Sequence, residues 1–138
     1  MKAEIKHIYG PDVPAGLKEW VPPNLSDFGL RLQVFIGTTD DDTSDSFDVV
    51  VCTPNWLTEK WAEGWFADAR LTDRVLSGHG VLLMKEWSYE ELRAALEQLV
   101  GRIDATTWGN VANRIGRHLD WEYAYRYDEY QDEGRPFP

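Results

Sequence analysis

The chain has few basic residues and no long apolar run. Its 138 residues include 14 Lys and Arg against 24 Asp and Glu, a formal charge of −10. Binding to nucleic-acid phosphates or to an anionic membrane depends on an excess of Lys and Arg. The charge therefore argues against both, and a basic partner is the natural complement. No stretch approaches the roughly 18 apolar residues of a membrane span, and the N-terminus lacks the apolar segment of a signal peptide. We expect a cytoplasmic protein.

Cysteine is nearly absent, since Cys52 is the only one and cannot form a disulfide within the chain. It follows three valines, a run that predicts a buried strand rather than a reactive surface thiol. A catalytic arrangement of Cys52 with His7 and His79 would need an imidazole beside the thiolate. A cysteine acting as a small buried hydrophobe explains the same residues more simply, and a reducing compartment is expected.

No internal repeat, linker or low-complexity segment interrupts the chain. With 43 % apolar and 13 % aromatic residues, the composition lies outside the range of disordered proteins. The length suits one domain over residues 1–138. Residues 128–138 are acidic and contain proline and glycine, so we expect this end to be a flexible tail unless something holds it.

Period-two alternation predicts strands over residues 2–9, 30–36 and 47–53. The first places Ala3, Ile5, His7 and Tyr9 on one face. Between it and the second strand, four prolines and two glycines indicate an ordered loop over 10–27. The second and third strands are expected to form a hairpin, and the valine run indicates that the third is covered on both sides.

The second half of the chain predicts mainly helices. Thr53 and Pro54 suit the N-cap and first position of a short helix to residue 61. Residues 64–73 fit a helix or a loop. Residues 81–84 predict a buried strand. A capping box at Ser88–Glu91 predicts a helix that continues just beyond Gly101, and a second helix is expected from Thr106 or Thr107 to about 119.

The aromatic residues after position 119 alternate with polar ones, which predicts a terminal strand over 120–127. Trp121, Tyr123, Tyr125 and Tyr127 would then share one face. Strands clustered early and helices late indicate an α+β fold: a mostly antiparallel sheet of about five strands with helices packed on one face.

Sequence motifs for catalysis are absent, since the phosphate-binding loop, dinucleotide, nucleophile-elbow and zincin patterns do not occur. Asp40, Asp42 and Ser44 imitate the first ligands of a calcium loop, but Asp45 stands where the turn needs glycine. A solvated hairpin loop is the simpler interpretation. We expect no enzyme activity, no catalytic residue and no cofactor.

His118, Asp120 and Glu122 would share a face if the terminal strand began at His118. Three such side chains at alternate positions could ligate a metal ion. A salt-bridged sheet face accounts for them without any metal ion, so we expect no metal.

Two segments carry carboxylates without any cation. Residues 40–48 hold five and residues 128–133 hold four, with Tyr130 among the second group. Ordinary solvated loops that keep the protein soluble are one explanation. The other is a surface for a basic partner, in which tyrosine supplies contact area and the charges steer the encounter. The candidate contact residues are Asp40, Asp41, Asp42, Asp45, Asp48, Asp128, Glu129, Tyr130, Asp132 and Glu133.

Four segments carry a resemblance to a known family. They are DFGLRLQVFIGT, SFDVVVCTPNWL, GHGVLLMKEWSYEEL and TTWGNVANRIGRHLDWEYAYRY. From about Asp27 to Tyr127 the chain resembles the immunity protein 8 family of bacterial polymorphic toxin systems. The VCTPNWL stretch and Trp121-Glu122-Tyr123 are its most distinctive parts.

The resemblance implies a non-catalytic protein that binds a cognate toxin and protects the cell that makes it. We expect the partner to be the C-terminal domain of a toxin, basic in charge, such as a nuclease domain. It would meet the carboxylates above, with Tyr130 or an exposed Trp as apolar anchor, and the free protein would be a monomer. Two alternatives stay open: a structural or regulatory module that dimerises or docks on a host protein, and an acidic mimic of DNA.

Overall fold

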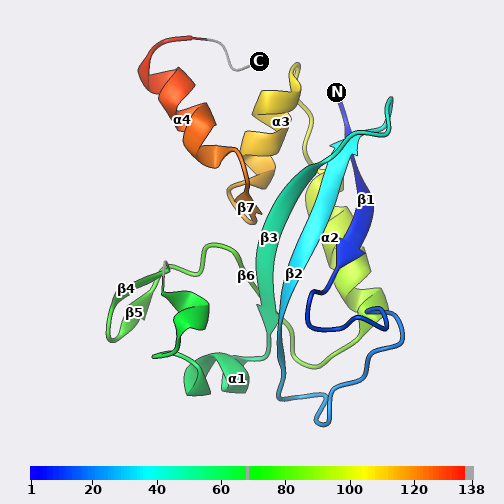
Figure 1. Ribbon diagram of the computed structural model, residues 1–138, viewed down its shortest axis with the longest axis vertical. Coiled ribbons are helices and arrows are strands. Elements are labelled where there is room, and N and C mark those ends of the chain that lie inside the picture. Colours follow the sequence, from blue (N-terminus) through cyan, green and yellow to red (C-terminus); the bar gives the residue numbers. More distant parts are fainter. Residues whose placement is uncertain (68, 136–138) are drawn as a thin grey trace.

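The computed structural model describes residues 1–67 and 69–135 and contains a five-stranded sheet (Figure 1). The strands of this sheet are β1 (Ala3–Tyr9), β2 (Gly29–Thr38), β3 (Asp45–Cys52), β6 (Val81–Leu83) and β7 (Asp120–Trp121). Strands β1, β2, β3 and β6 are neighbours in that order, and β7 also pairs with β3. Only the β3–β6 pairing is parallel among these. The predicted α+β fold with a mostly antiparallel sheet is confirmed.

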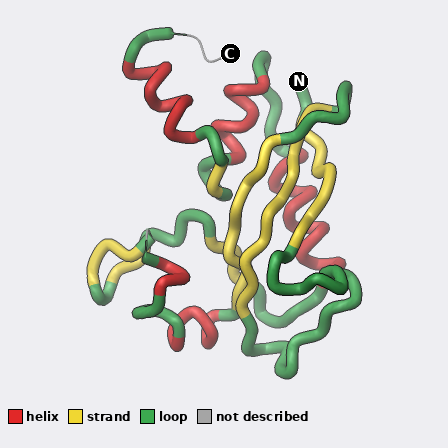
Figure 2. The backbone as a smooth tube through the Cα atoms, viewed as in Figure 1, coloured by secondary structure: helices red, strands yellow, loops and turns green. Residues whose placement is uncertain are grey.

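The β2–β3 hairpin has the predicted alternation. Its register runs from Gly29 opposite Cys52 to Ile36 opposite Asp45. The inward side chains of β2 are all buried: Leu30, Leu32, Val34 and Ile36. They pack against the apolar faces of the helices, and Figure 2 shows α2 (Tyr89–Gly101) lying along one side of the sheet. The opposite side of these strands carries Arg31, Gln33 and Asp48, together with the apolar Phe35 and Val50.

Strand β1 departs from the predicted single face. Its pairing with β2 shifts between Ile5 and His7, so Ile5 and Ile8 are both buried while His7 and Tyr9 are exposed. A bulge of this kind inserts one residue and moves the following side chains to the other face, which simple alternation does not reveal.

Two helices begin at the predicted caps. The Ser88 hydroxyl accepts a hydrogen bond from the Glu91 N–H at 3.3 Å, at the start of α2. The Thr107 hydroxyl accepts from the Asn110 N–H at 3.2 Å, at the start of α3 (Trp108–Ile115). These helices end at Gly101 and Ile115, earlier than their apolar spacing predicts.

The short helix α1 (Pro54–Glu59) has Thr53 at its N-cap position as expected, but the Thr53 side chain makes no capping hydrogen bond. The buried hydroxyl accepts instead from the Phe28 N–H at 3.1 Å. Residues 64–76 form a 3₁₀ helix, η1 (Gly64–Phe66), and a two-stranded ribbon of β4 (Arg70–Thr72) and β5 (Val75–Leu76). The 81–84 run is an edge strand whose Leu83 is exposed, not the buried strand predicted.

The predicted loop over 10–27 is confirmed, and aromatic packing holds it in place. The ring of Trp87 lies edge-on to Trp20 and Phe28, with centroids 4.9 and 5.4 Å away. Its indole N–H donates to the Trp20 carbonyl at 3.0 Å.

The predicted terminal strand is wrong beyond its second residue. Strand β7 contains only Asp120 and Trp121, and helix α4 (Ala124–Asp132) follows. The Glu122 carboxylate accepts a hydrogen bond from the Ser46 N–H at 2.7 Å. The backbone carbonyl of Tyr123 accepts hydrogen bonds from the N–H groups of Arg126 and Tyr127. Aromatic residues four apart also suit one helical face, so alternation alone did not distinguish strand from helix. Within the described residues, no helix has the length and apolarity to cross a membrane.

Asp45 joins the hairpin to the C-terminal segment. One of its carboxylate oxygens accepts from the indole N–H groups of Trp108 at 2.8 Å and of Trp121 at 3.0 Å. Trp121 is buried and stacks on Phe47, with ring centroids 6.4 Å apart. One acidic side chain thus fixes α3 and β7 against the start of β3.

We predict that Asp45→Ala lowers the free energy of unfolding by about 1–3 kcal/mol, because two partly buried indole donors lose a charged acceptor. Chemical denaturation measures the change. Asp42→Ala, on the exposed turn of the same hairpin, is the matched control and should change stability little. Equal effects of the two substitutions would contradict the role assigned to Asp45.

Candidate protein-binding face

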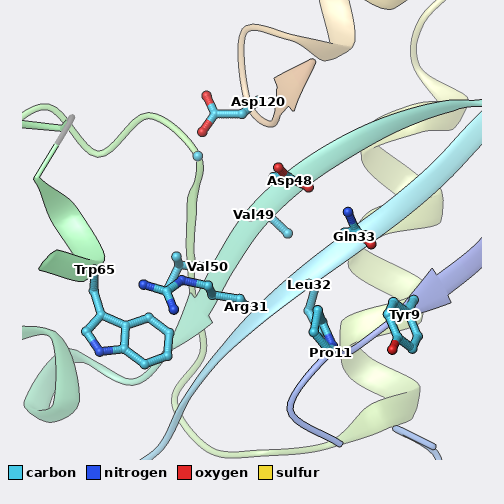
Figure 3. Close-up of a pocket in the computed structure, with 11 residues that line it drawn as sticks. Tyr9, Pro11, Arg31, Leu32, Gln33, Asp48, Val49, Val50, Trp65 and Asp120 are labelled. Atoms are coloured by element: carbon cyan, nitrogen blue, oxygen red, sulfur yellow. The ribbon is translucent and has the colours of Figure 1, made fainter. Parts of the chain in front are cut away.

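The side of the sheet opposite α2 contains a pocket of about 470 Å³ (Figure 3). Arg31 and Gln33 reach it from β2, and Asp48 and Val50 from β3. Tyr9, Pro11, Trp65, Gly80 and Asp120 complete its rim. The pocket therefore lies where the polar half of the β2–β3 alternation meets segments from both halves of the chain.

Aromatic packing builds one wall of the pocket. The Trp56 ring of α1 lies so close to Gly29 that a Cβ there would be 2.3 Å from it. Trp56 meets the Trp65 ring edge-on, with centroids 4.7 Å apart. The Arg31 guanidinium carbon lies 4.0 Å from the centroid of the Trp65 ring, and Figure 3 shows this side chain directed toward the indole. The positive charge of the pocket is thus held at this wall by a cation–π contact.

Carboxylates occupy the opposite wall. Partial burial is the main cause that raises the pKa of Asp48, and repulsion from Asp120 and Glu122 adds to it. A hydrogen bond from Gln33 opposes the shift. Strands β3 and β7 pair at Asp48 and Asp120, which explains why the acidic groups meet. Their mutual repulsion shows that negative charge is concentrated here.

His79 holds Asp120 in place. Its Nδ1 lies 3.0 Å from the Asp120 carboxylate and its Nε2 lies 2.7 Å from the carbonyl oxygen of Gly116. The next residue, Gly80, has φ +72°, and a Cβ there would be 2.8 Å from the Asp120 carboxylate. The Val50 N–H donates to the Gly80 carbonyl at 2.8 Å. This network positions the acidic wall over β3.

In the structure, residues considered for a catalytic thiol or for a metal site make other contacts. Cys52 is buried, which raises the pKa of its thiol to about 11, and His79 is engaged by Asp120. Asp120 and Glu122 bind different groups, the His79 imidazole and the Ser46 amide. Across residues 1–67 and 69–135, no group of three or more His, Cys, Asp or Glu is arranged to hold a metal ion.

The predicted acidic loop divides into three parts. Asp40, Asp41 and Asp42 are exposed on the β2–β3 turn. Hydrogen bonds from the Thr43 hydroxyl and amide lower the pKa of Asp41. Asp45 binds the two indoles, and Asp48 lies apart from the turn, in the pocket. The turn therefore presents three exposed carboxylates, with the Lys6 ammonium donating to the Asp41 carbonyl at 2.9 Å.

The predicted tail patch lies on α4 and the residues after it. Figure 1 shows α4 and the β2–β3 turn at the same end of the molecule, with α3 between them. Tyr130 is half-buried, and the Arg135 guanidinium lies 4.3 Å from its ring centroid. Arg135 also forms an ion pair with Glu133. The acidic segment identified in the sequence ended at residue 133 and therefore did not include Arg135. The side chains of Asp128, Glu129 and Asp132 lie outside the described part of the structure.

Sequence patterns found Asp48 but not its surroundings. Arg31 and Gln33 are visible as the polar half of β2, yet alternation alone cannot show that Trp65 and Asp120 enclose them. The His118, Asp120 and Glu122 spacing did mark the acidic wall, under a metal-binding interpretation.

The family model described as Immunity protein 8 matches residues 3–126. The chain belongs to the immunity protein 8 family. It is an immunity protein, and membership implies a cognate toxin as its partner. No curated protein and no solved structure matches the chain. All of the pocket and the acidic turn of this immunity protein lie within the matched residues, whereas the candidates from Asp128 onward lie beyond them.

We predict that Asp48→Asn raises the thermal stability of the immunity protein at neutral pH. A raised pKa means that the folded chain binds this proton more tightly than the unfolded chain does. At pH values above the pKa that Asp48 has in the folded state, its ionised carboxylate therefore lowers the free energy of unfolding. This destabilisation disappears as the pH falls through that pKa. The gain in melting temperature should shrink with acidification.

Thermal melts of wild type and variant at a series of pH values measure this difference. Asp42→Asn on the exposed turn serves as control, for which we expect no comparable gain. A constant or negative difference for Asp48→Asn across the series would show that its charge is not destabilising.

Proposed function

We propose that this immunity protein neutralises its cognate toxin by direct protein–protein contact with a basic toxin domain. The observation that carries the proposal is the acidic wall of Asp48 and Asp120 on the side of the sheet opposite α2, to which the nearby Glu122 adds negative charge. Arg31, the cation of the same pocket, is held at the other wall by Trp65. Carboxylates on an uncovered face suit a partner that brings its own cations.

The charge of the whole chain supports the same partner. A formal charge of −10 raises the rate of encounter with a basic protein, and steered association reaches about 10⁸–10⁹ M⁻¹s⁻¹ at low salt. A nuclease domain fits this description, because its groove must attract phosphates. We infer that a monomer meets the C-terminal domain of the toxin in the cytoplasm and blocks it without catalysis.

Affinity capture tests the proposal. The tagged full-length chain is used to capture proteins from a lysate of its source organism, with washes at moderate and high salt, and mass spectrometry identifies them. We predict capture of the C-terminal domain of a large secreted protein, weakened by salt because its contacts are charged. Capture of only the chain itself or of a housekeeping protein would favour a dimeric or regulatory module instead.

Association kinetics with the captured domain test the acidic turn. We predict that changing Asp40, Asp41 and Asp42 together to Lys slows association at low salt by about tenfold, because steering depends on charge near the interface. The matched control changes Glu19, Glu59 and Glu86 to Lys, an equal change in net charge at other exposed sites. Equal slowing by both triple variants would remove the turn from the interface.

A further inference from the structure

We propose that the pocket on the open side of the sheet receives an arginine side chain of the toxin domain, with its guanidinium between Asp48 and Asp120. This inference rests on the proposed function and assigns a specific contact to it. The site is a built concavity, with strands β2 and β3 as its floor and side chains from β7 and η1 among its walls (Figure 3). Its volume of about 470 Å³ accommodates a long side chain together with adjoining backbone.

The carboxylates at one end of the pocket favour the binding of a cation there. Asp48 and Asp120 approach each other because their backbones pair across β3 and β7. Asp120 is held by His79, and a hydrogen bond joins Asp48 to Gln33. In the described part of the chain, no Lys or Arg forms an ion pair with either carboxylate. A guanidinium entering here would relieve the repulsion that the two acids exert on each other.

The shape and the other walls favour arginine over lysine. A guanidinium is planar and donates to carboxylates through two parallel hydrogen bonds, which a lysine ammonium cannot do. The apolar lining from Val50 and Pro11 can cover the methylene stem. Arg31, fixed on Trp65 at the far wall, can donate to a carbonyl oxygen of the incoming segment. The pocket thus matches an arginine side chain together with the backbone of that arginine residue.

A short peptide tests the pocket without the toxin. The isotope-labelled full-length protein is titrated with a triarginine amide and followed by nuclear magnetic resonance. We expect the largest shifts at Gln33, Asp48, Val50 and Gly80 and at the Trp65 indole, with trilysine amide binding several-fold more weakly. Shifts confined to the 40–45 turn, or equal binding of the two peptides, would overturn the assignment.

Matched variants show which carboxylates the peptide uses. Asp48→Asn with Asp120→Asn should weaken triarginine binding by about tenfold or more, because the guanidinium loses both of its charged acceptors. Asp40→Asn with Asp42→Asn removes the same charge from the turn and should have little effect. Unchanged spectra outside the pocket verify that the variants fold, and equal weakening by both pairs would overturn the assignment.

The captured toxin domain separates this inference from the proposed function. If the wild type binds the domain and the Asp48/Asp120 pair of substitutions weakens binding more than the Asp40/Asp42 pair does, both stand. If the wild type binds and both pairs of substitutions act equally, the pocket is overturned while the proposed function stands. If the wild type does not bind the toxin domain, the proposed function itself fails.

Discussion

The antiparallel pairing of β2 with β3 is the constraint on which the rest of this immunity protein depends. Its register sends alternate side chains to opposite sides of the sheet. Leu32 and Val49 face the core, whereas Arg31 and Asp48 face away from it. A slip of one residue would exchange the two sets. The same pairing that buries the core therefore creates the polar face that lines the pocket.

The C-terminal half is placed on this hairpin by a small number of polar contacts. The Asp45 carboxylate accepts hydrogen bonds from two indole N–H groups, and the Glu122 carboxylate accepts one from the Ser46 N–H. The backbone pairing of Asp120 with Asp48 places the Asp120 side chain beside β3. The acidic wall is consequently a tertiary product, because its members come from strands more than seventy residues apart in the chain.

The pocket concentrates like charges, which a fold selected only for stability would avoid. Repulsion and partial burial both raise the pKa of Asp48, so its ionised form opposes folding. Binding surfaces often carry such costs, since groups arranged for a partner are incompletely satisfied without it. By contrast, the carboxylate of Asp45 accepts two indole hydrogen bonds within the fold. In the sequence, Asp45 and Asp48 look equivalent.

Local patterns in the sequence determined much of the fold. Alternation predicted β2 and β3, and side-chain caps predicted the starts of α2 and α3, because these signals depend on neighbouring residues only. They failed where a distant contact decided the outcome: the β1 bulge, the buried hydroxyl of Thr53 and the change from β7 to α4. The four resembling segments indicated the immunity protein 8 family, and the family match confirms it. Only the tertiary structure divided the acidic residues by role, since the surroundings of a carboxylate are set by chain segments far away in sequence.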